Sequence, residues 1–431
     1  MLTLWLMNAH AQDLSIPHEH YELANGLDVI LIEDHSLPQV VVNLWYDVGS
    51  SNEVKGRTGF AHLFEHLMFM GTDRVPGNGF DTAMEAHGGW NNAWTSEDAT
   101  DYYEVGPSNL LETLLWLEAD RLESLGASMT QDKLDLQRDV VRNERRQSYE
   151  NAPYGKLWLE LPAAMYPEGH PYAHPVIGSH EDLVAAQVSD VTDFFGTWYV
   201  PNNASLVVAG DFDSEAIKPV IERMFGHIPA GELPEMGDVA PVDAPQKARV
   251  EVTDKVQIPL GVLAWHSPAA LKDGDAEMDL VASVLAGGRA SRLYRRLVDS
   301  GLALEVDASQ FSQDLGSLFL IDFKPTEGNS LDVLQDTVFE ELATLATEGP
   351  TQEELERAIN GFEMDFLYKL ESLHSRASAL NRYNVAVGAP DWLAQDLARY
   401  RNATTEGVRA AAALLTAERA ASLRVLPQEA E

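Results

Sequence analysis

The chain has 431 residues, enough for more than one hydrophobic core, and we expect two domains. Its 68 acidic and 30 basic residues give a formal net charge of −38, which argues against a nucleic-acid partner because phosphates would be repelled. The absence of cysteine excludes disulfides and thiolate metal ligands, and no segment is long and apolar enough to span a membrane. The acidic excess is explained by a solvated surface, or by an acidic chamber that favours basic peptides.

The N-terminal residues 1–11 are apolar and end in Ala9-His10-Ala11, which has the small-x-small form of a signal-peptidase site. No basic region precedes them. We interpret this segment as a truncated signal peptide and predict a periplasmic location; a short disordered or strand-forming N-terminus in a cytoplasmic protein is the alternative.

The segment 59–72 contains the motif His-x-x-Glu-His at His62, Glu65 and His66. Two histidines four positions apart project from one face of a helix and can bind one metal ion. Glu65 lies on the same face, where its carboxylate can reach water at the metal without being a ligand. The alternative is a buried helix whose histidines satisfy local hydrogen bonds. Metal binding is favoured because polar groups in so apolar a segment cost free energy without a partner.

Residues 88–103 alternate small, β-branched and aromatic side chains, which predicts a strand. An unpaired strand edge can capture an extended peptide through main-chain hydrogen bonds. An edge strand without any ligand is the alternative.

A catalytic zinc site normally has three protein ligands, so one more ligand must come from elsewhere in the chain. The best candidate is Glu144, which follows His66 by 78 residues in a charged, helical segment at 137–147. Taken alone, Glu144 would be interpreted as a solvated helix glutamate, and the motif upstream reverses that interpretation.

Together, the motif and the run Arg-Asp-Val-Val-Arg-Asn-Glu at 138–144 resemble the M16 family of inverted-zincin peptidases, which includes pitrilysin, insulin-degrading enzyme and mitochondrial processing peptidase. The resemblance implies a zinc metalloendopeptidase that binds one zinc ion per chain through His62, His66 and Glu144. It implies Glu65 as the catalytic base that acts on a peptide substrate.

Two further segments are similar to the same family. Residues 88–103 resemble its Gly-Gly-x-x-Asn-Ala-x-Thr strand, which implies that Asn92, Ala93 and Thr95 bind the substrate. Residues 194–211 resemble the helix, Tyr-x-Pro-x-Asn turn and strand that close the family's first lobe.

An internal repeat predicts the architecture. Residues 31–45 and 252–265 share an acidic turn, a proline and an apolar strand that ends in tryptophan, and residues 203–208 loosely match 421–425. We therefore expect an N-terminal zinc-binding lobe at 12–225, a linker rich in proline and glycine at 226–248, and a C-terminal lobe at 249–431. Each lobe is expected to be α+β, with a mostly antiparallel sheet flanked by helices, and the family resemblance implies that the two homologous lobes form half of a clamshell.

The second half lacks a metal site, because its corresponding segment at 278–288 is apolar and contains no histidine. Active members of the family carry Arg-x-x-x-Gly-Leu-Ala-Tyr in a second lobe, whereas this chain has Leu297 and Leu304 at the arginine and tyrosine positions. The resemblance therefore implies a heterodimer in which a homologous subunit supplies the pair. Arg292, Tyr294 and Arg295 could replace it only in a different alignment.

The remaining candidate site residues are interpreted as structural and not as functional. His170 and His174 are four apart, but the proline between them indicates a loop. The Arg376 and Tyr383 pair lacks the Gly-Leu-Ala context, so we interpret it as structural. A non-catalytic assembly subunit or a peptide-binding subunit is the alternative function, although such chains of the family typically lose the motif that is intact here.

Overall fold

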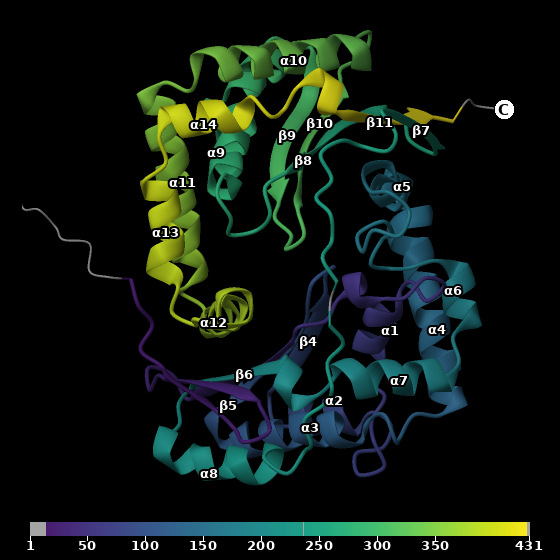
Figure 1. The fold of residues 1–431 in the computed structure, drawn as a ribbon, viewed down its shortest axis with the longest axis vertical. Coiled ribbons are helices and arrows are strands. Elements are labelled where there is room, and N and C mark those ends of the chain that lie inside the picture. The colour runs from purple at the N-terminus through teal and green to yellow at the C-terminus, as the bar shows by residue number, and fades with distance from the viewer. Residues whose placement is uncertain (1–13, 236, 429–431) are drawn as a thin grey trace, which may run out of the picture.

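Residues 14–235 and 237–428 are described by a computed structural model, and they form two lobes that are each built on one β-sheet (Figure 1). The predicted signal peptide at 1–11 lies outside the described residues. In the described parts of the predicted linker, 226–235 and 237–248, the chain forms no helix or strand. Among the described residues, the helices are all too short or too polar to cross a membrane.

The first lobe contains a six-stranded sheet in the order β1-β2-β6-β3-β5-β4. All neighbouring strands are antiparallel except β2 and β6, which are parallel. The strands are β1 (Glu19–Glu22), β2 (Asp28–Glu33), β3 (Gln39–Tyr46), β4 (Trp90–Thr95), β5 (Thr100–Pro107) and β6 (Ala204–Gly210). The helices are α1 (Phe60–Leu67), α2 (Gly79–Glu85), α3 (Leu111–Ser124), α4 (Gln131–Arg145), α5 (Gly155–Met165), α6 (His180–Ala185), α7 (Val188–Trp198) and α8 (Ser214–Phe225).

The second lobe contains a five-stranded sheet in the order β7-β11-β8-β10-β9, in which only β7 and β11 are parallel. The strands are β7 (Arg249–Asp254), β8 (Leu260–Ser267), β9 (Ala303–Phe311), β10 (Ser317–Pro325) and β11 (Ala421–Pro427). The helices are α9 (Asp275–Ala286), α10 (Leu331–Glu348), α11 (Gln352–Lys369), α12 (Leu373–Val387), α13 (Leu393–Arg401) and α14 (Thr405–Ala412).

The two sheets have the same topology. The order β2-β6-β3-β5-β4 of the first sheet becomes β7-β11-β8-β10-β9 in the second, with β1 as an additional edge strand. The predicted α+β fold with two related, mostly antiparallel sheets is therefore confirmed. One local expectation needs correction, because residues 88–103 form the hairpin of β4 and β5 rather than one strand. The hydroxyl of Ser96 accepts hydrogen bonds from the backbone N–H groups of Asp98 and Ala99, which stabilises the turn.

Each half contributes a helix to the other half's sheet (Figure 1). The first half's α5 places Leu157 and Leu161 against residues of β8, β10 and β11. In return, α12 places Leu380 against Val41 of β3 and Val207 of β6. Strand β3 is consequently buried on both faces, as its nearly continuous apolar sequence requires. This exchange ties the two lobes into one packed structure.

A second contact between the lobes is polar and includes an acidic side chain that is largely removed from water. The carboxylate of Asp98, in the β4–β5 turn, accepts a hydrogen bond of 3.1 Å from the backbone N–H of Asp314, in the β9–β10 turn. Tyr172 donates its hydroxyl to Asp98 and accepts the N–H of Leu315 at 3.0 Å. Burial raises the pKa of Asp98 to about 7, and the Asp314 carboxylate adds to this shift.

We expect Leu380→Ala to lower the free energy of unfolding by about 2–5 kcal/mol, because it opens a cavity in the exchanged-helix core. Leu380 is fully buried there, whereas Met364 on α11 is 65% exposed. Met364→Ala is the matched control and should change stability by less than about 0.5 kcal/mol. Chemical denaturation of both variants measures the difference, and equal effects would show that α12 does not support the first sheet.

The Asp98 contact predicts a pH dependence of stability. An acid whose pKa rises on folding, here from 3.8 to about 7, binds its proton more tightly in the folded chain. Its contribution to stability is therefore largest at low pH and is lost as the pH rises through that range. Asp98→Asn should flatten this part of the stability curve, whereas Asp238→Asn in the exposed linker should not. Thermal melts between about pH 4 and 8 measure the slopes; parallel curves for wild type and Asp98→Asn would contradict the assignment.

Candidate metal centre

Helix α1 presents two chemically different faces. Phe60, Leu63, Phe64 and Leu67 are buried in the core of the first lobe. His62, Glu65 and His66 lie on the opposite, partly accessible side. The apolar spacing thus anchors the helix and leaves the polar residues of the predicted motif free for another role.

The start of α1 is fixed by a buried carboxylate that the sequence analysis did not identify. Glu53 accepts hydrogen bonds of 2.8 Å from the backbone N–H groups of Gly59 and Ala61, which lie at the N-terminus of the helix and would otherwise lack partners. Its side chain is completely buried, and burial raises its pKa well above the ordinary value even though these hydrogen bonds oppose the shift. A glutamate six residues before a helix-starting glycine is the only sequence signal for this cap.

A close backbone approach also fixes the entry to α1. Gly59 has a left-handed backbone with φ of 87°, and a Cβ atom on Gly178 would lie 2.3 Å from the Gly59 Cα atom. Only glycine fits such a contact. The loop before α6 is therefore pressed against the first turn of the helix that carries the motif.

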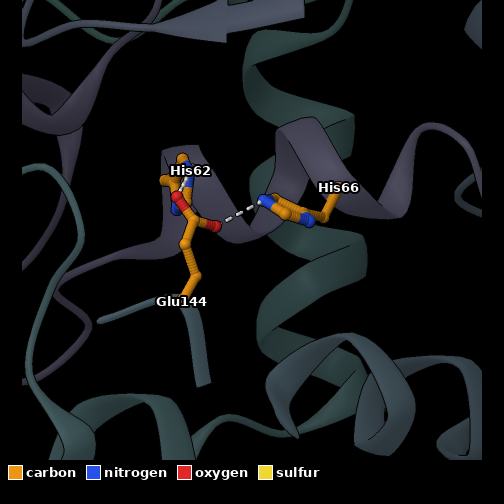
Figure 2. Close-up of side chains that lie close together, drawn as sticks. All are labelled: His62, His66 and Glu144. Atoms are coloured by element: carbon orange, nitrogen blue, oxygen red, sulfur yellow. Dashed lines mark ion pairs between the residues drawn. The ribbon is translucent and has the colours of Figure 1, made fainter. Parts of the chain in front are cut away.

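Glu144 reaches the two histidines from α4, the helix that packs beside α1 (Figure 2). Its Oε2 atom lies 3.3 Å from His66 Nε2, and its Oε1 atom lies 3.7 Å from His62 Nε2. One ligand atom from each of the three residues lies within 4.8 Å of the others. These distances suit one tetrahedral zinc ion, because bonds of about 2.0–2.1 Å place neighbouring ligand atoms about 3.4 Å apart.

The electrostatics of this cluster favour the protonation states that bind metal. Burial and the neighbouring His66 lower the pKa of His62 to about 4, so its imidazole is neutral at physiological pH. The hydrogen bond with His66 lowers the pKa of Glu144, which keeps its carboxylate ionised. Neutral imidazole and ionised carboxylate are the forms that donate electron pairs to a divalent cation. The donor set therefore fits a zinc ion, and side-chain exposures of 13% for His62 and 38% for Glu144 leave it accessible.

Glu65 is not part of the three-ligand group. Its Oε2 atom accepts a hydrogen bond of 2.6 Å from the hydroxyl of Thr95 on β4, and burial raises its pKa. Thr95 is also one of the residues predicted to bind substrate, and its hydroxyl is the donor of this hydrogen bond. The other two predicted substrate residues, Asn92 and Ala93, lie on the same strand at the edge of the sheet, and the Asn92 side chain is exposed.

The two leucines at the expected arginine and tyrosine positions lie in different environments. Leu297 is completely buried in the core of that lobe, whereas Leu304 is 51% exposed on β9. Arg292 binds Glu354 at 2.7 Å, which commits it to an ion pair. Arg376 binds Asp34 at 2.8 Å across the lobes, in agreement with its structural interpretation.

The remaining histidine pair also behaves as expected. Residues 170–174 form turns rather than a helix. His170 stacks on Tyr166 with ring centroids 4.5 Å apart, and His174 approaches the capping carboxylate of Glu53 at 3.6 Å. Neither histidine joins a three-ligand group among the described residues.

Several proteins named as proteases are similar to this chain. Zinc protease PqqE of Helicobacter pylori is 29% identical over 381 residues, which span 87% of this chain and 85% of that protein. The beta subunit of the mitochondrial-processing peptidase of Lentinula edodes is 24% identical over 85% of this chain and 80% of that subunit. The crystal structure of a protease from Helicobacter pylori superposes with a TM-score of 0.86 at 26% identity and covers 96% of this chain and 100% of that one.

Two family descriptions cover most of the chain. Residues 28–178 match the family described as insulinase, peptidase family M16, and residues 185–362 match the peptidase M16 inactive domain. The first match contains all three residues of the cluster and Glu65, and the second covers most of the lobe that lacks a histidine motif. The chain therefore belongs to the M16 peptidase family.

Proposed function

We propose that this protein is a zinc-dependent endopeptidase that hydrolyses oligopeptides or unfolded segments, and that it is the catalytic subunit of a heterodimer. The observation that carries the proposal is the convergence of His62, His66 and Glu144 from two separate helices, with the Glu65 carboxylate beside them. Membership of a peptidase family, with a relative named a zinc protease, supports the same chemistry.

The roles of the residues follow from their positions. His62, His66 and Glu144 would hold the metal, and a bound zinc ion would polarise a peptide carbonyl and increase the acidity of water. Glu65 accepts the proton of the attacking water and returns it to the leaving amine. The raised pKa of Glu65 suits a group that takes up a proton and then releases it. Thr95 holds one oxygen of that carboxylate.

Strand β4 is the proposed substrate platform. It ends the sheet order of the first lobe, so one of its edges has no neighbouring strand within residues 14–235 and 237–428. An extended peptide can extend the sheet there through main-chain hydrogen bonds. Thr95 and Ala93 belong to this strand, which would bring a bound peptide close to Glu65. Asn92, Ala93 and Thr95 would then contact the substrate.

The second subunit is proposed because this chain lacks a needed pair of donors. Neither Leu297 nor Leu304 can donate a hydrogen bond to the oxyanion that develops during attack on a peptide carbonyl. The subunit name of the mitochondrial relative supports a paired assembly. A homologous chain with arginine and tyrosine at these positions would complete the site.

A non-catalytic assembly or peptide-binding subunit is the second candidate. The description of residues 185–362 as an inactive domain favours it. However, a purely structural role requires neither three converging ligands nor a carboxylate beside them. One equivalent of bound zinc would distinguish the two functions. The periplasmic location stays a prediction from residues 1–11.

We expect Glu65→Gln to retain stoichiometric zinc and to lower turnover of an internally quenched peptide by about 10²–10⁴-fold, because it removes the base but no proposed ligand. His62→Ala should lose both zinc and turnover. Glu22→Gln, which removes an exposed carboxylate on β1, is the matched control and should behave like wild type. Elemental analysis and fluorescence measure the two properties, and unchanged turnover in Glu65→Gln would remove this residue from the mechanism.

We expect the zinc-loaded chain alone to be weakly active and to gain about 10²–10³-fold in turnover when mixed with a homologous subunit that carries the Arg-x-x-x-Gly-Leu-Ala-Tyr sequence, because one oxyanion donor contributes about that factor. The same subunit with its arginine and tyrosine replaced by leucine is the control. An isolated chain that is as active as every mixture would contradict the heterodimer.

A further inference from the structure

A cavity of about 640 Å³ lies in the C-terminal half of the chain and includes no residue of the metal cluster. Helices α9, α11, α12 and α13 and the end of β9 surround it. Pockets that bind small molecules commonly occupy about 300–1,000 Å³ and combine apolar walls with a few polar groups. The cavity therefore has the size of a ligand site that is separate from the candidate metal centre.

The charged residues of the lining fall into a paired group and an unpaired group. Arg399 binds Asp275 at 2.7 Å and Asp396 at 2.8 Å. Because two carboxylates face one guanidinium, this group retains a negative charge, which hydrogen bonds from the hydroxyls of Ser312 and Tyr383 stabilise. The remaining charged residues of the lining are two acids and two bases, namely Asp279, Asp365, Lys369 and Arg382. The cavity therefore suits a ligand that carries both an ammonium and a carboxylate group.

The Asp279 carboxylate can receive the ammonium group. One of its oxygens accepts a hydrogen bond of 2.6 Å from the Tyr400 hydroxyl, and no lysine or arginine among residues 14–235 and 237–428 forms an ion pair with it. Burial raises its pKa to about 6, so it is mostly ionised at neutral pH. The charge of Arg399 opposes this shift, but its guanidinium is bound to the two other carboxylates. A carboxylate can accept about four hydrogen bonds, and a partly buried charge gains from a partner.

An aromatic wall leads away from Asp279 along α11. Phe362 stacks on Tyr400 with ring centroids 3.3 Å apart, and Phe366 lies next to Phe362 with centroids 5.9 Å apart. Lys369 follows on the same face, because positions i, i+4 and i+7 align on a helix. Seven residues of helix rise about 10 Å, which is also the length of about three extended residues.

Lys369 and Arg382 supply the unpaired positive charge. Both are exposed, and neither forms a hydrogen bond or ion pair in the described part of the chain. The same holds for Asp365, one turn before Lys369 on α11. Burial raises the pKa of Asp314 in the β9–β10 turn, and Arg382 opposes that shift, so Arg382 has an acidic neighbour but no bound partner. Both cations can therefore pair with a ligand carboxylate.

His374 adds a polar atom without a partner to the same lining. Its Nε2 atom is buried and forms no hydrogen bond with any described residue. The ring is held by stacking on Tyr103 of β5, with centroids 3.9 Å apart, and burial lowers its pKa, so the imidazole is neutral. A neutral imidazole can donate one hydrogen bond, which a polar ligand would accept.

We propose that this cavity binds a short peptide of about three residues through both of its free ends. Asp279 binds the ammonium group, and Lys369 and Arg382 bind the carboxylate. Apolar side chains of the peptide pack against Phe362 and Phe366. A free amino acid carries the same two groups on one residue, which is too short to reach from one end of the aromatic wall to the other. The inference goes beyond the proposed function, since it requires neither hydrolysis nor a metal.

Calorimetric titration of the full-length Glu65→Gln chain, in which a bound peptide should stay intact, tests the assignment. Ala-Leu-Ala with free ends should bind about 10–100-fold more tightly than its N-acetylated form, because a hydrogen bond to a charged group contributes about that factor. Amidation of the C-terminus should weaken binding by about 2–5-fold, as expected for exposed ion pairs. Leucine alone should bind more weakly than Ala-Leu-Ala, and equal affinities would overturn the assignment to a peptide.

Substitutions in the same chain locate the two peptide ends. Acetylation should have no effect in Asp279→Asn, which keeps the shape of the side chain, and amidation should have none in Lys369→Gln/Arg382→Gln. Asp273→Asn and Lys255→Gln, at exposed positions outside the cavity, are the matched controls and should keep both effects. Melting temperatures verify folding, and the two exposed cations provide a test that does not depend on the folding of Asp279→Asn.

Binding elsewhere gives a different result. A peptide that lies on strand β4 or at the metal centre would show the same effect of acetylation with and without Asp279→Asn, and this outcome would overturn the assignment. An effect of amidation that survives Lys369→Gln/Arg382→Gln would also overturn it. A chain that binds Ala-Leu-Ala as expected but hydrolyses no peptide would refute only the proposed peptidase function.

Discussion

The packing of α1 against α4 is the constraint on which the rest of the site depends. Helix α1 presents two histidines on one face, but the third proposed ligand, Glu144, belongs to α4 and is 78 residues distant from His66 in the chain. The buried Glu53 cap and the Gly59–Gly178 contact fix where α1 begins. A metal site tolerates only small errors in ligand position. The positions of α1 and α4 must therefore be fixed before the three side chains can bind one ion.

The exchange of helices between the halves gives the site a rigid support. Helix α12 covers the face of the first sheet that the first half leaves open, and α5 does the same for the second sheet. Burial of β3 on both faces therefore requires residues from both halves of the chain. The two lobes are coupled through their cores as well as through the polar contact at Asp98, so displacement of one lobe would disturb the packing of the other.

The two copies of the fold carry different residues on sheets that share one topology. The first lobe combines a candidate metal cluster and a candidate base within α1 and α4. In the second lobe, α9 is almost entirely apolar toward its core, and Leu297 and Leu304 occupy the positions at which the family resemblance predicts arginine and tyrosine. Under the proposed function, the first lobe would supply the metal ligands and the substrate platform, and another chain would supply the remaining donors.

The sequence by itself determined the i,i+4 histidines and the Glu65 carboxylate on the same helix face, and its internal repeat predicted two related α+β lobes. Periodicity and residue type carry this information because neighbouring side chains on one helix need no tertiary contact to share a face. Only the tertiary structure decided that Glu144 meets both histidines, that Thr95 holds Glu65, and that residues 88–103 turn back as a hairpin. It alone placed His374 of the second half against Tyr103 of the first, because contacts between separate elements depend on how helices pack and leave no periodic pattern in the chain.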